Sequence, residues 1–172
     1  MLYDPEEDSF LLLTFIKSYA KGSILDLGSG TGILAKEAMK YSRDVLAADI
    51  NQESVSYCKK QGIKAVKSDL FSKIKGKFDL IIFNPPYLPH EKKENQEHSL
   101  VLSGGKKGSE ILKRFLKTAK SHLKKNANIL IVVSSLTGNV ERLFKKYGFG
   151  FELLKEEKYF FERLKAYCLS VW

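Results

Sequence analysis

The segment that decides the fold reads Ser23-Ile24-Leu25-Asp26-Leu27-Gly28-Ser29-Gly30-Thr31-Gly32. It begins as a short apolar strand and ends as a glycine cluster that opens a helical stretch. Glycines at such a junction let the backbone turn sharply and approach a ligand closely, and free amide groups at a helix start favour polar or anionic groups. The spacing is GxGxG, not the GxGxxG of dinucleotide sites, because Ile33 follows Gly32. The segment alone leaves two alternatives, a ligand-binding loop and a tight turn.

Apolar strands and amphipathic helices alternate along the rest of the chain. We expect helices at 7–19, 33–41, 52–61, 110–123 and 139–147, and strands at 23–27, 44–49, 63–66, 78–83, 127–133, 151–155 and 164–172. Strict alternation implies right-handed crossovers and a mainly parallel sheet, with helices on both faces. The last two strands have no helix between them, which predicts one antiparallel strand at or near an edge. The predicted fold class is a single-domain α/β fold with a seven-stranded, mainly parallel sheet.

Length and composition fit one globular domain over residues 1–172, with an N-terminal helix region at 1–20. No apolar run approaches the roughly 18 residues that a membrane-spanning helix needs. The first residues are acidic, unlike a signal or transit peptide. Cys58 and Cys168 stand alone without metal-ligand spacing, so we expect neither a disulfide framework nor a metal site, and a reducing cytoplasm. The polar segment His90–His98 is predicted to be a mobile loop.

The formal net charge is +9, and nearly all of the positive charge comes from lysine. Such a surface attracts anionic partners such as nucleic acid without reading their sequence. The alternative is a general lysine bias, with lysines on solvated helix faces. Base recognition usually depends on arginine, of which the chain has four. The charge therefore leaves both interpretations open.

Three aspartates follow three successive predicted strands: Asp26, Asp49 and Asp69. The carboxyl ends of parallel strands form the edge at which ligands bind in open α/β sheets. There Asp49 can accept hydrogen bonds from both hydroxyls of a ribose, Asp69 can accept from an exocyclic amine, and Leu70 offers an apolar wall for a purine. Any one aspartate could instead cap a helix. Three at equivalent positions predict a nucleoside pocket without a pyrophosphate.

The tetrad Asn84-Pro85-Pro86-Tyr87 follows the fourth strand and is the most specific motif in the chain. Two prolines fix φ and remove two backbone donors, so carbonyl groups line this corner. The Asn84 side-chain oxygen and the Pro85 carbonyl can each accept one hydrogen of a planar NH₂ group, which would fix the orientation of its nitrogen. Tyr87 offers an aromatic face for stacking. The structural alternative is a rigid turn that ends a strand.

The glycine loop, the aspartates and the tetrad together resemble the S-adenosylmethionine-dependent class I methyltransferases. In that group the tetrad accompanies transfer to planar NH₂ nitrogens of adenine, cytosine or glutamine. The opening segment, Tyr3 to Leu13, is similar to the HemK-related glutamine methyltransferases of class 1 release factors, in their short archaeal and eukaryotic branch. The likeness covers nearly the whole chain, including Gly104-Gly105 and Gly108. Asp4 and Glu6 depart from the usual pattern.

The resemblance implies a role for each residue of the site. Ser9 would bind the methionine end of the cofactor, and Asp26 would hold its amino group through the loop of Gly28, Gly30 and Gly32. Asp49 would hold the ribose, and Asp69 with Leu70 the adenine. Asn84 would contact both the cofactor and the substrate amide.

The substrate and partner that the resemblance implies are a class 1 release factor, methylated at glutamine in its Gly-Gly-Gln loop, and a small zinc-binding activator subunit. In the usual order of this fold the third strand is terminal, so Ile63–Val66 would offer an edge for the activator to form a heterodimer. Nucleic acid would be met only indirectly, and membranes not at all. Two alternatives remain open. One is an adenine N6-methyltransferase of DNA or RNA, or a protein-lysine methyltransferase; the other is an interaction subunit without catalysis. Length argues against DNA, because the cofactor fold leaves only the 90–98 loop to read a sequence.

Overall fold

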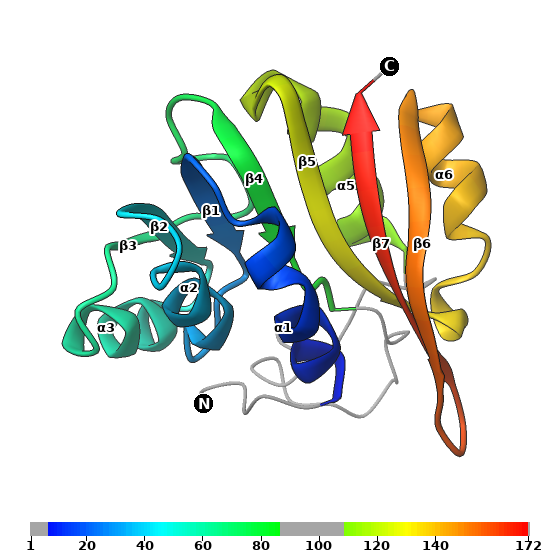
Figure 1. The fold of residues 1–172 in the computed structure, drawn as a ribbon, viewed down its shortest axis with the longest axis horizontal. Helices are drawn as coiled ribbons and strands as arrows, with labels where there is room; N and C mark the ends of the chain where they lie inside the picture. Colours follow the sequence, from blue (N-terminus) through cyan, green and yellow to red (C-terminus); the bar gives the residue numbers. More distant parts are fainter. Residues whose placement is uncertain (1–6, 87–108, 172) are drawn as a thin grey trace.

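Seven strands form one sheet in the order β3-β2-β1-β4-β5-β7-β6 (Figure 1). The computed structural model describes residues 7–86 and 109–171. The strands are β1 (Ser23–Leu27), β2 (Asp44–Asp49), β3 (Ala65–Lys67), β4 (Phe78–Phe83), β5 (Leu123–Ser134), β6 (Phe149–Lys158) and β7 (Arg163–Val171). Strands β3, β2, β1, β4 and β5 are parallel, whereas β7 is antiparallel to both β5 and β6. The predicted single antiparallel strand near an edge is confirmed.

Helices cover both faces of this sheet. They are α1 (Glu7–Tyr19), α2 (Ile33–Ala38), α3 (Gln52–Lys60), α5 (Glu110–Ala119) and α6 (Val140–Lys146), with short 3₁₀ turns η1 (Lys120–His122) and η2 (Ser135–Thr137). Side chains alternate along each strand, so one strand supplies both cores. In β4, Leu80 and Ile82 pack with α1, α2 and α3, whereas Ile81 and Phe83 pack with α5 and α6. Burial on both faces explains why the strand is almost wholly apolar.

Four strands differ from their predicted limits. β6 extends beyond the predicted 151–155 at both ends and β7 begins one residue before 164, whereas the third and fifth strands differ for identifiable reasons. The third strand is Ala65–Lys67 and not Ile63–Val66, because the Ile63 side chain packs into the core beside α2 and α3. The fifth strand begins at Leu123 and not Ala127. Exposed polar residues at 124–126 hide its start from an apolar pattern, and the register with β4 shifts there.

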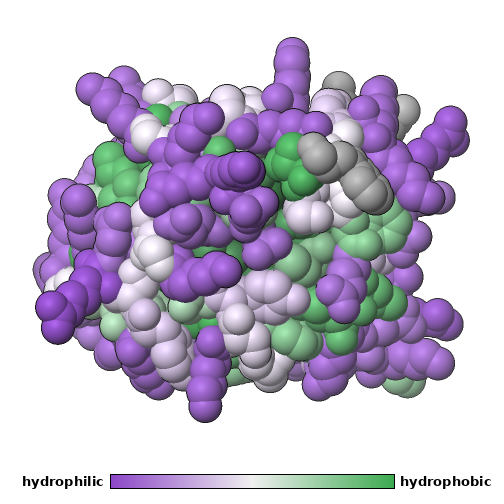
Figure 2. All heavy atoms as spheres, turned by 45° about the horizontal axis from the view of Figure 1, so that its top comes forward, coloured by the Kyte–Doolittle hydropathy of each residue, from purple (hydrophilic) through white to green (hydrophobic). Residues whose placement is uncertain are grey.

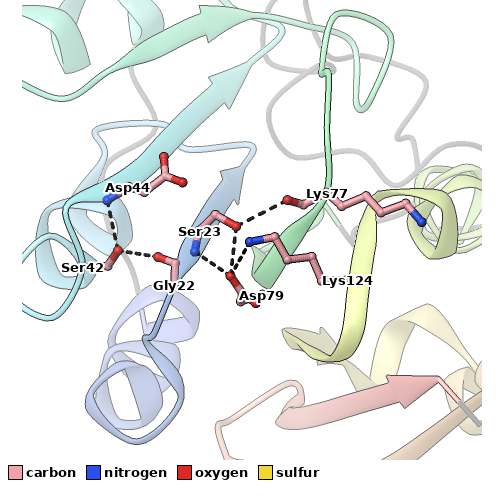
Figure 3. Close-up of polar contacts among 7 residues, drawn as sticks. All are labelled: Gly22, Ser23, Ser42, Asp44, Lys77, Asp79 and Lys124. Carbon is pink, nitrogen blue, oxygen red and sulfur yellow. Dashed lines mark hydrogen bonds and ion pairs between the residues drawn. The ribbon is translucent and has the colours of Figure 1, made fainter.

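A polar cluster ties β1, β4 and β5 together at the amino-terminal edge of the sheet (Figure 3). The Asp79 carboxylate accepts hydrogen bonds from the Ser23 amide at 2.8 Å and the Ser23 hydroxyl at 3.0 Å, and forms an ion pair with Lys124 at 2.8 Å. Gly22 precedes β1 at φ +63°, and a Cβ on it would lie 2.1 Å from the Asp79 carboxylate. Glycine is required there for both conformation and space.

Figure 2 views the molecule with the amino-terminal edge turned forward, and hydrophilic side chains cover most of that view. In the part of the chain that the structure describes, no helix is long and apolar enough to cross a membrane. The carboxyl ends of the parallel strands lie at the opposite edge, together with the start of α1 and the turn between β6 and β7 (Figure 1).

Candidate active site

The glycine loop joins β1 to α2, and β2 takes up several of its backbone amides. The amides of Gly28 and Ser29 donate to the Ala48 carbonyl at 2.7 and 3.1 Å. The Gly30 amide donates to the Asp49 carboxylate at 2.8 Å. These three groups precede the helix start, where free amides are expected, and the neighbouring strand satisfies them. The loop therefore lacks the converging amides that make a phosphate cradle, which agrees with a ligand that has no pyrophosphate.

Gly32 has a packing role in the loop. It precedes α2 at φ +76°, and a Cβ there would lie 2.7 Å from Ile63 and 2.8 Å from the Cys58 sulfur. The buried Cys58 thiol also lies 3.7 Å from the Gly30 carbonyl. The sequence predicts Gly32 among the cofactor contacts, and this stays a prediction. In the structure its lack of a side chain lets α3 pack closely against the loop.

Asp26 is the buried acid at the end of β1. One carboxylate oxygen accepts a hydrogen bond from the Ala35 amide of α2 at 3.0 Å. The other oxygen, Oδ1, is buried and has no hydrogen-bond partner among the described residues. Burial raises the pKa of this carboxyl to about 7; the Ala35 amide opposes that effect and the Asp49 charge adds to it. An orphaned buried oxygen beside the loop fits an acceptor for a cationic ligand group.

Asp49, at the end of β2, links the loop after β1 to the turn after β2. Its two carboxylate oxygens accept from the amides of Gly30 and Asn51, each at 2.8 Å. Burial raises its pKa, although these backbone hydrogen bonds lower it. Carboxylate oxygens have further acceptor capacity, so both contacts leave room for ribose hydroxyls.

Asp69 and Leu70 follow β3 beside a pocket of about 600 Å³. Ile50, Ser68 and Asp69 are among the residues that line it. Leu70 has φ +47°, which is unusual for leucine, and the Ser68 hydroxyl holds the turn by donating to the Leu70 carbonyl at 2.7 Å. The sequence left out one contact: Arg114 of α5 forms an ion pair with Asp69 at 2.8 Å. No local pattern connects two residues that are 45 positions apart.

Asn84 and Ser9 meet at the carboxyl end of β4, although 75 positions separate them. The Asn84 side-chain nitrogen donates to the Ser9 hydroxyl at 3.3 Å. Ser9 is buried in the first turns of α1. The Asn84 side-chain oxygen, Oδ1, is buried without a partner among the described residues. The nitrogen of the Asn84 amide is thus held by Ser9. Its oxygen has no hydrogen-bond partner among the described residues, and a bound ligand could donate that hydrogen bond.

The remaining predicted residues are only partly visible. Pro85 is buried and Pro86 half-buried after Asn84. Tyr87, the 90–98 segment and the glycines at 104, 105 and 108 lie outside the described residues. Within 7–86 and 109–171, no group of three or more histidine, cysteine, aspartate or glutamate side chains is arranged to hold a metal ion.

Strand order, acids at three strand ends and an amide acceptor after β4 define a Rossmann-like methyltransferase. The family model "Methyltransferase small domain" matches residues 5–161. A candidate protein N5-glutamine methyltransferase of Methanocaldococcus jannaschii is 38% identical, covering 99% of this chain and 91% of that protein. The release factor glutamine methyltransferase of Streptococcus pneumoniae is 32% identical over 73% of this chain, which spans half of that enzyme.

Solved structures give the same fold. The Mtq2 chain of the E. cuniculi Mtq2-Trm112 complex, described as methylating the termination factor eRF1, has a TM-score of 0.80 and 22% identity, with 99% of each chain covered. The chain belongs to the methyltransferase small domain family and, within it, to the protein N5-glutamine methyltransferases. Its cofactor is S-adenosylmethionine, and the orphaned oxygens of Asp26 and Asn84 fit that group.

Proposed function

We propose that this enzyme methylates the side-chain amide nitrogen of glutamine in the Gly-Gly-Gln loop of a class 1 translation release factor. The observation that supports it most directly is the buried, unpartnered Asn84 oxygen at the end of β4. A primary amide has two N–H groups in one plane, and such an acceptor matches one of them. The substrate makes the cytoplasm, where translation terminates, the place of action.

The Asn84 oxygen and the Pro85 carbonyl each accept one hydrogen of the substrate NH₂ group. Two acceptors in fixed positions orient the nitrogen lone pair and draw electron density toward it, which assists an otherwise poor nucleophile. Ser9 holds the Asn84 amide in the orientation that presents this oxygen. When bound, S-adenosylmethionine supplies a methyl group on a sulfonium. Tyr87, which lies outside the described residues, is the predicted stacking partner of the flat amide.

The cofactor contacts follow the strand ends. Asp26 and the Gly28–Gly32 loop hold the amino-acid end, together with Ser9. Asp49 accepts from the ribose hydroxyls, and Asp69 with Leu70 contacts the adenine. Arg114 leaves the second oxygen of Asp69 to accept from the adenine amine, because the ion pair involves Oδ2.

A small zinc-binding activator subunit binds the β3 edge in this proposal. β3 ends the sheet. The Lys64 carbonyl and the Ser68 amide bond to β2. Hydrogen bonding in a parallel pair alternates along the strand, so Ala65 and Lys67 direct their backbone groups outward, toward a partner strand.

The test is transfer of labelled methyl from S-adenosylmethionine to a release factor, to its Gln→Ala loop variant and to unmodified DNA, with and without a candidate activator. We expect label on the intact factor only. Label on the Gln→Ala variant would contradict the glutamine assignment. Label on DNA alone would assign the enzyme to adenine N6.

A further inference from the structure

The tip of the β6–β7 hairpin carries two phenylalanines that the fold does not use. Phe160 is 93% exposed and Phe161 85% exposed. Their rings contact each other edge to face, with centroids 4.7 Å apart. Neither residue has a positive φ. Hairpin loops favour glycine, asparagine and aspartate, so turn geometry does not ask for phenyl groups here. Two adjacent exposed rings on a projecting loop are typical of an interaction surface.

The hairpin brings this tip past the edge at which the site lies. The last pair between β5 and β7 joins Ser134 to Leu164, whereas β6 and β7 continue to the pair Lys158 and Arg163. The Tyr159 amide donates to the Glu162 carbonyl at 2.8 Å and closes the loop. β7 therefore continues one residue, Arg163, beyond its last pair with β5, and the loop of residues 159–162 lies beyond that residue. Figure 1 shows the hairpin projecting beyond the sheet on the side where β1 and β4 end.

Contacts at its base hold the hairpin in this position. The Ser134 hydroxyl donates to the Glu162 carboxylate, and the Arg163 amide donates to the Ser135 hydroxyl at 3.1 Å. Leu164 of β7 belongs to the same buried cluster as Leu12 of α1, so the hairpin base lies near the helix that carries Ser9. A preorganised arm loses little entropy on binding.

The charges of the hairpin favour a protein partner. Lys155 pairs with Glu157 at 2.6 Å, and Arg163 and Lys165 lie 3.7 and 3.4 Å from Glu156. Because acids of the hairpin neutralise these cations, the tip offers little net attraction to anionic lipid or nucleic acid. Apolar rings in neutral surroundings match an apolar patch on a folded protein.

We propose that Phe160 and Phe161 anchor the folded body of the protein substrate, at a distance from the glutamine that is methylated. This inference rests on the proposed function. β3 and β6 are opposite ends of the sheet, so a substrate held by the hairpin lies on the far side of the site from the proposed activator edge. The anchor gives selectivity for an intact factor over the same loop as a free peptide.

The experiment compares two substrates, an intact release factor and a short peptide containing its Gly-Gly-Gln loop. The enzymes, each with its activator where needed, are the wild type, Phe160→Ser, the double variant Phe160→Ser/Phe161→Ser, and the control Leu153→Ser. Leu153 is 45% exposed on β6, away from the tip. For the double variant we expect the ratio of kcat/KM for the factor to kcat/KM for the peptide to fall about 10- to 100-fold, through KM. Phe160→Ser should have an intermediate effect, and Leu153→Ser should keep the wild-type ratio.

Each other outcome has a defined meaning. A wild-type ratio in the double variant overturns the anchor, while labelling of both substrates by the wild type keeps the proposed function. Loss of a dimer in the double variant, or of binding to vesicles of phosphatidylcholine and phosphatidylserine, assigns the tip to self-association or to lipid and overturns the anchor as well. A wild-type enzyme that labels neither substrate overturns the proposed function itself.

Discussion

At the scale of single residues, the site consists of polar atoms held on one side and unpartnered on the other. Asn84 donates to Ser9 and leaves its buried oxygen without a partner in the described chain. Asp26 accepts from Ala35 and likewise leaves one oxygen. Burying polar atoms without a hydrogen-bond partner lowers the stability of the free protein, and a ligand that supplies the partner removes this loss.

Asn84→Ala removes the acceptor for the substrate amide, so we expect kcat to fall on the order of 10³-fold. Affinity for S-adenosylhomocysteine should remain within a few-fold, because the acids at the other strand ends are intact. Ser9→Ala removes the hydrogen bond that orients Asn84 and the proposed contact of Ser9 with the methionine end of the cofactor, and should lower kcat/KM about tenfold. Calorimetry with the product and single-turnover label transfer separate the two effects. Normal turnover in Asn84→Ala would refute the role of this residue.

The raised pKa of Asp26 predicts two pH dependences of opposite sign, one for the stability of the protein and one for its affinity for the cofactor. Its folded pKa of about 7 lies above the ordinary 3.8, so its contribution to stability is complete below about pH 4 and is lost as pH rises through 7. Cofactor binding needs the ionised form to hold an ammonium group, so below pH 7 the Kd should rise by up to about tenfold per pH unit. Titrations of S-adenosylhomocysteine between pH 5.5 and 8.5 check this, and Asp26→Asn should flatten the profile. The same slope in both proteins would assign the titration to another group.

At the scale of elements, the carboxyl and amino ends of the strands have different roles. The carboxyl edge carries the site, and the amino edge carries the Asp79 cluster that joins β1, β4 and β5. Strand β3 is one lateral edge of the sheet, and its outward backbone groups are the proposed contact for the activator.

Gly22→Ala should destabilise the amino edge strongly. A methyl group would meet the Asp79 carboxylate, and φ +63° is unfavourable for alanine. Gly62→Ala is the matched control, because φ is +77° there but nothing lies within 4 Å. We expect losses of about 2–4 kcal/mol and about 1 kcal/mol, measured by urea unfolding. Equal losses would show that the Asp79 contact has no energetic importance.

Lys67→Pro should weaken binding of the activator. Proline removes the outward N–H of β3, while the inward hydrogen bonds of Val66 and Ser68 remain. Lys67→Ala keeps the N–H and loses the same charge, so it is the control. Affinity measured by calorimetry should fall at least tenfold for the proline variant alone. Equal weakening in both variants would assign the effect to the lysine charge.

At the scale of the whole molecule, the proposed cofactor site draws on four strand ends, so binding should stabilise the entire sheet. At 100 times Kd, S-adenosylhomocysteine contributes about 2.7 kcal/mol, which corresponds to a Tm increase of roughly 5–10 °C. Asp49→Ala should reduce the increase at the same ligand concentration. Differential scanning fluorimetry measures both, and an unchanged Tm in the wild type would place the ligand elsewhere.

Much of this arrangement could be predicted from sequence. The limits of α1, β1, β2 and β4 agree with the predicted ranges, because apolar periodicity and glycine punctuation mark them. Contacts between distant positions could not be predicted: Asp69 with Arg114, or Asn84 with Ser9. The role of Ile63 was also hidden, because an apolar residue before a strand is compatible with both pairing and packing. The roles of the cofactor residues remain predictions.

The reversed direction of β7 has a consequence for how this enzyme can change over time. A parallel last strand would need a crossover across a sheet face, and no arm would form beside the site. The hairpin instead leaves its loop outside both cores. Mutations at Phe160 and Phe161 therefore alter substrate recognition without lowering the stability of the fold or the affinity for the methyl donor. Substrate choice can drift or be redesigned there while the chemistry stays constant.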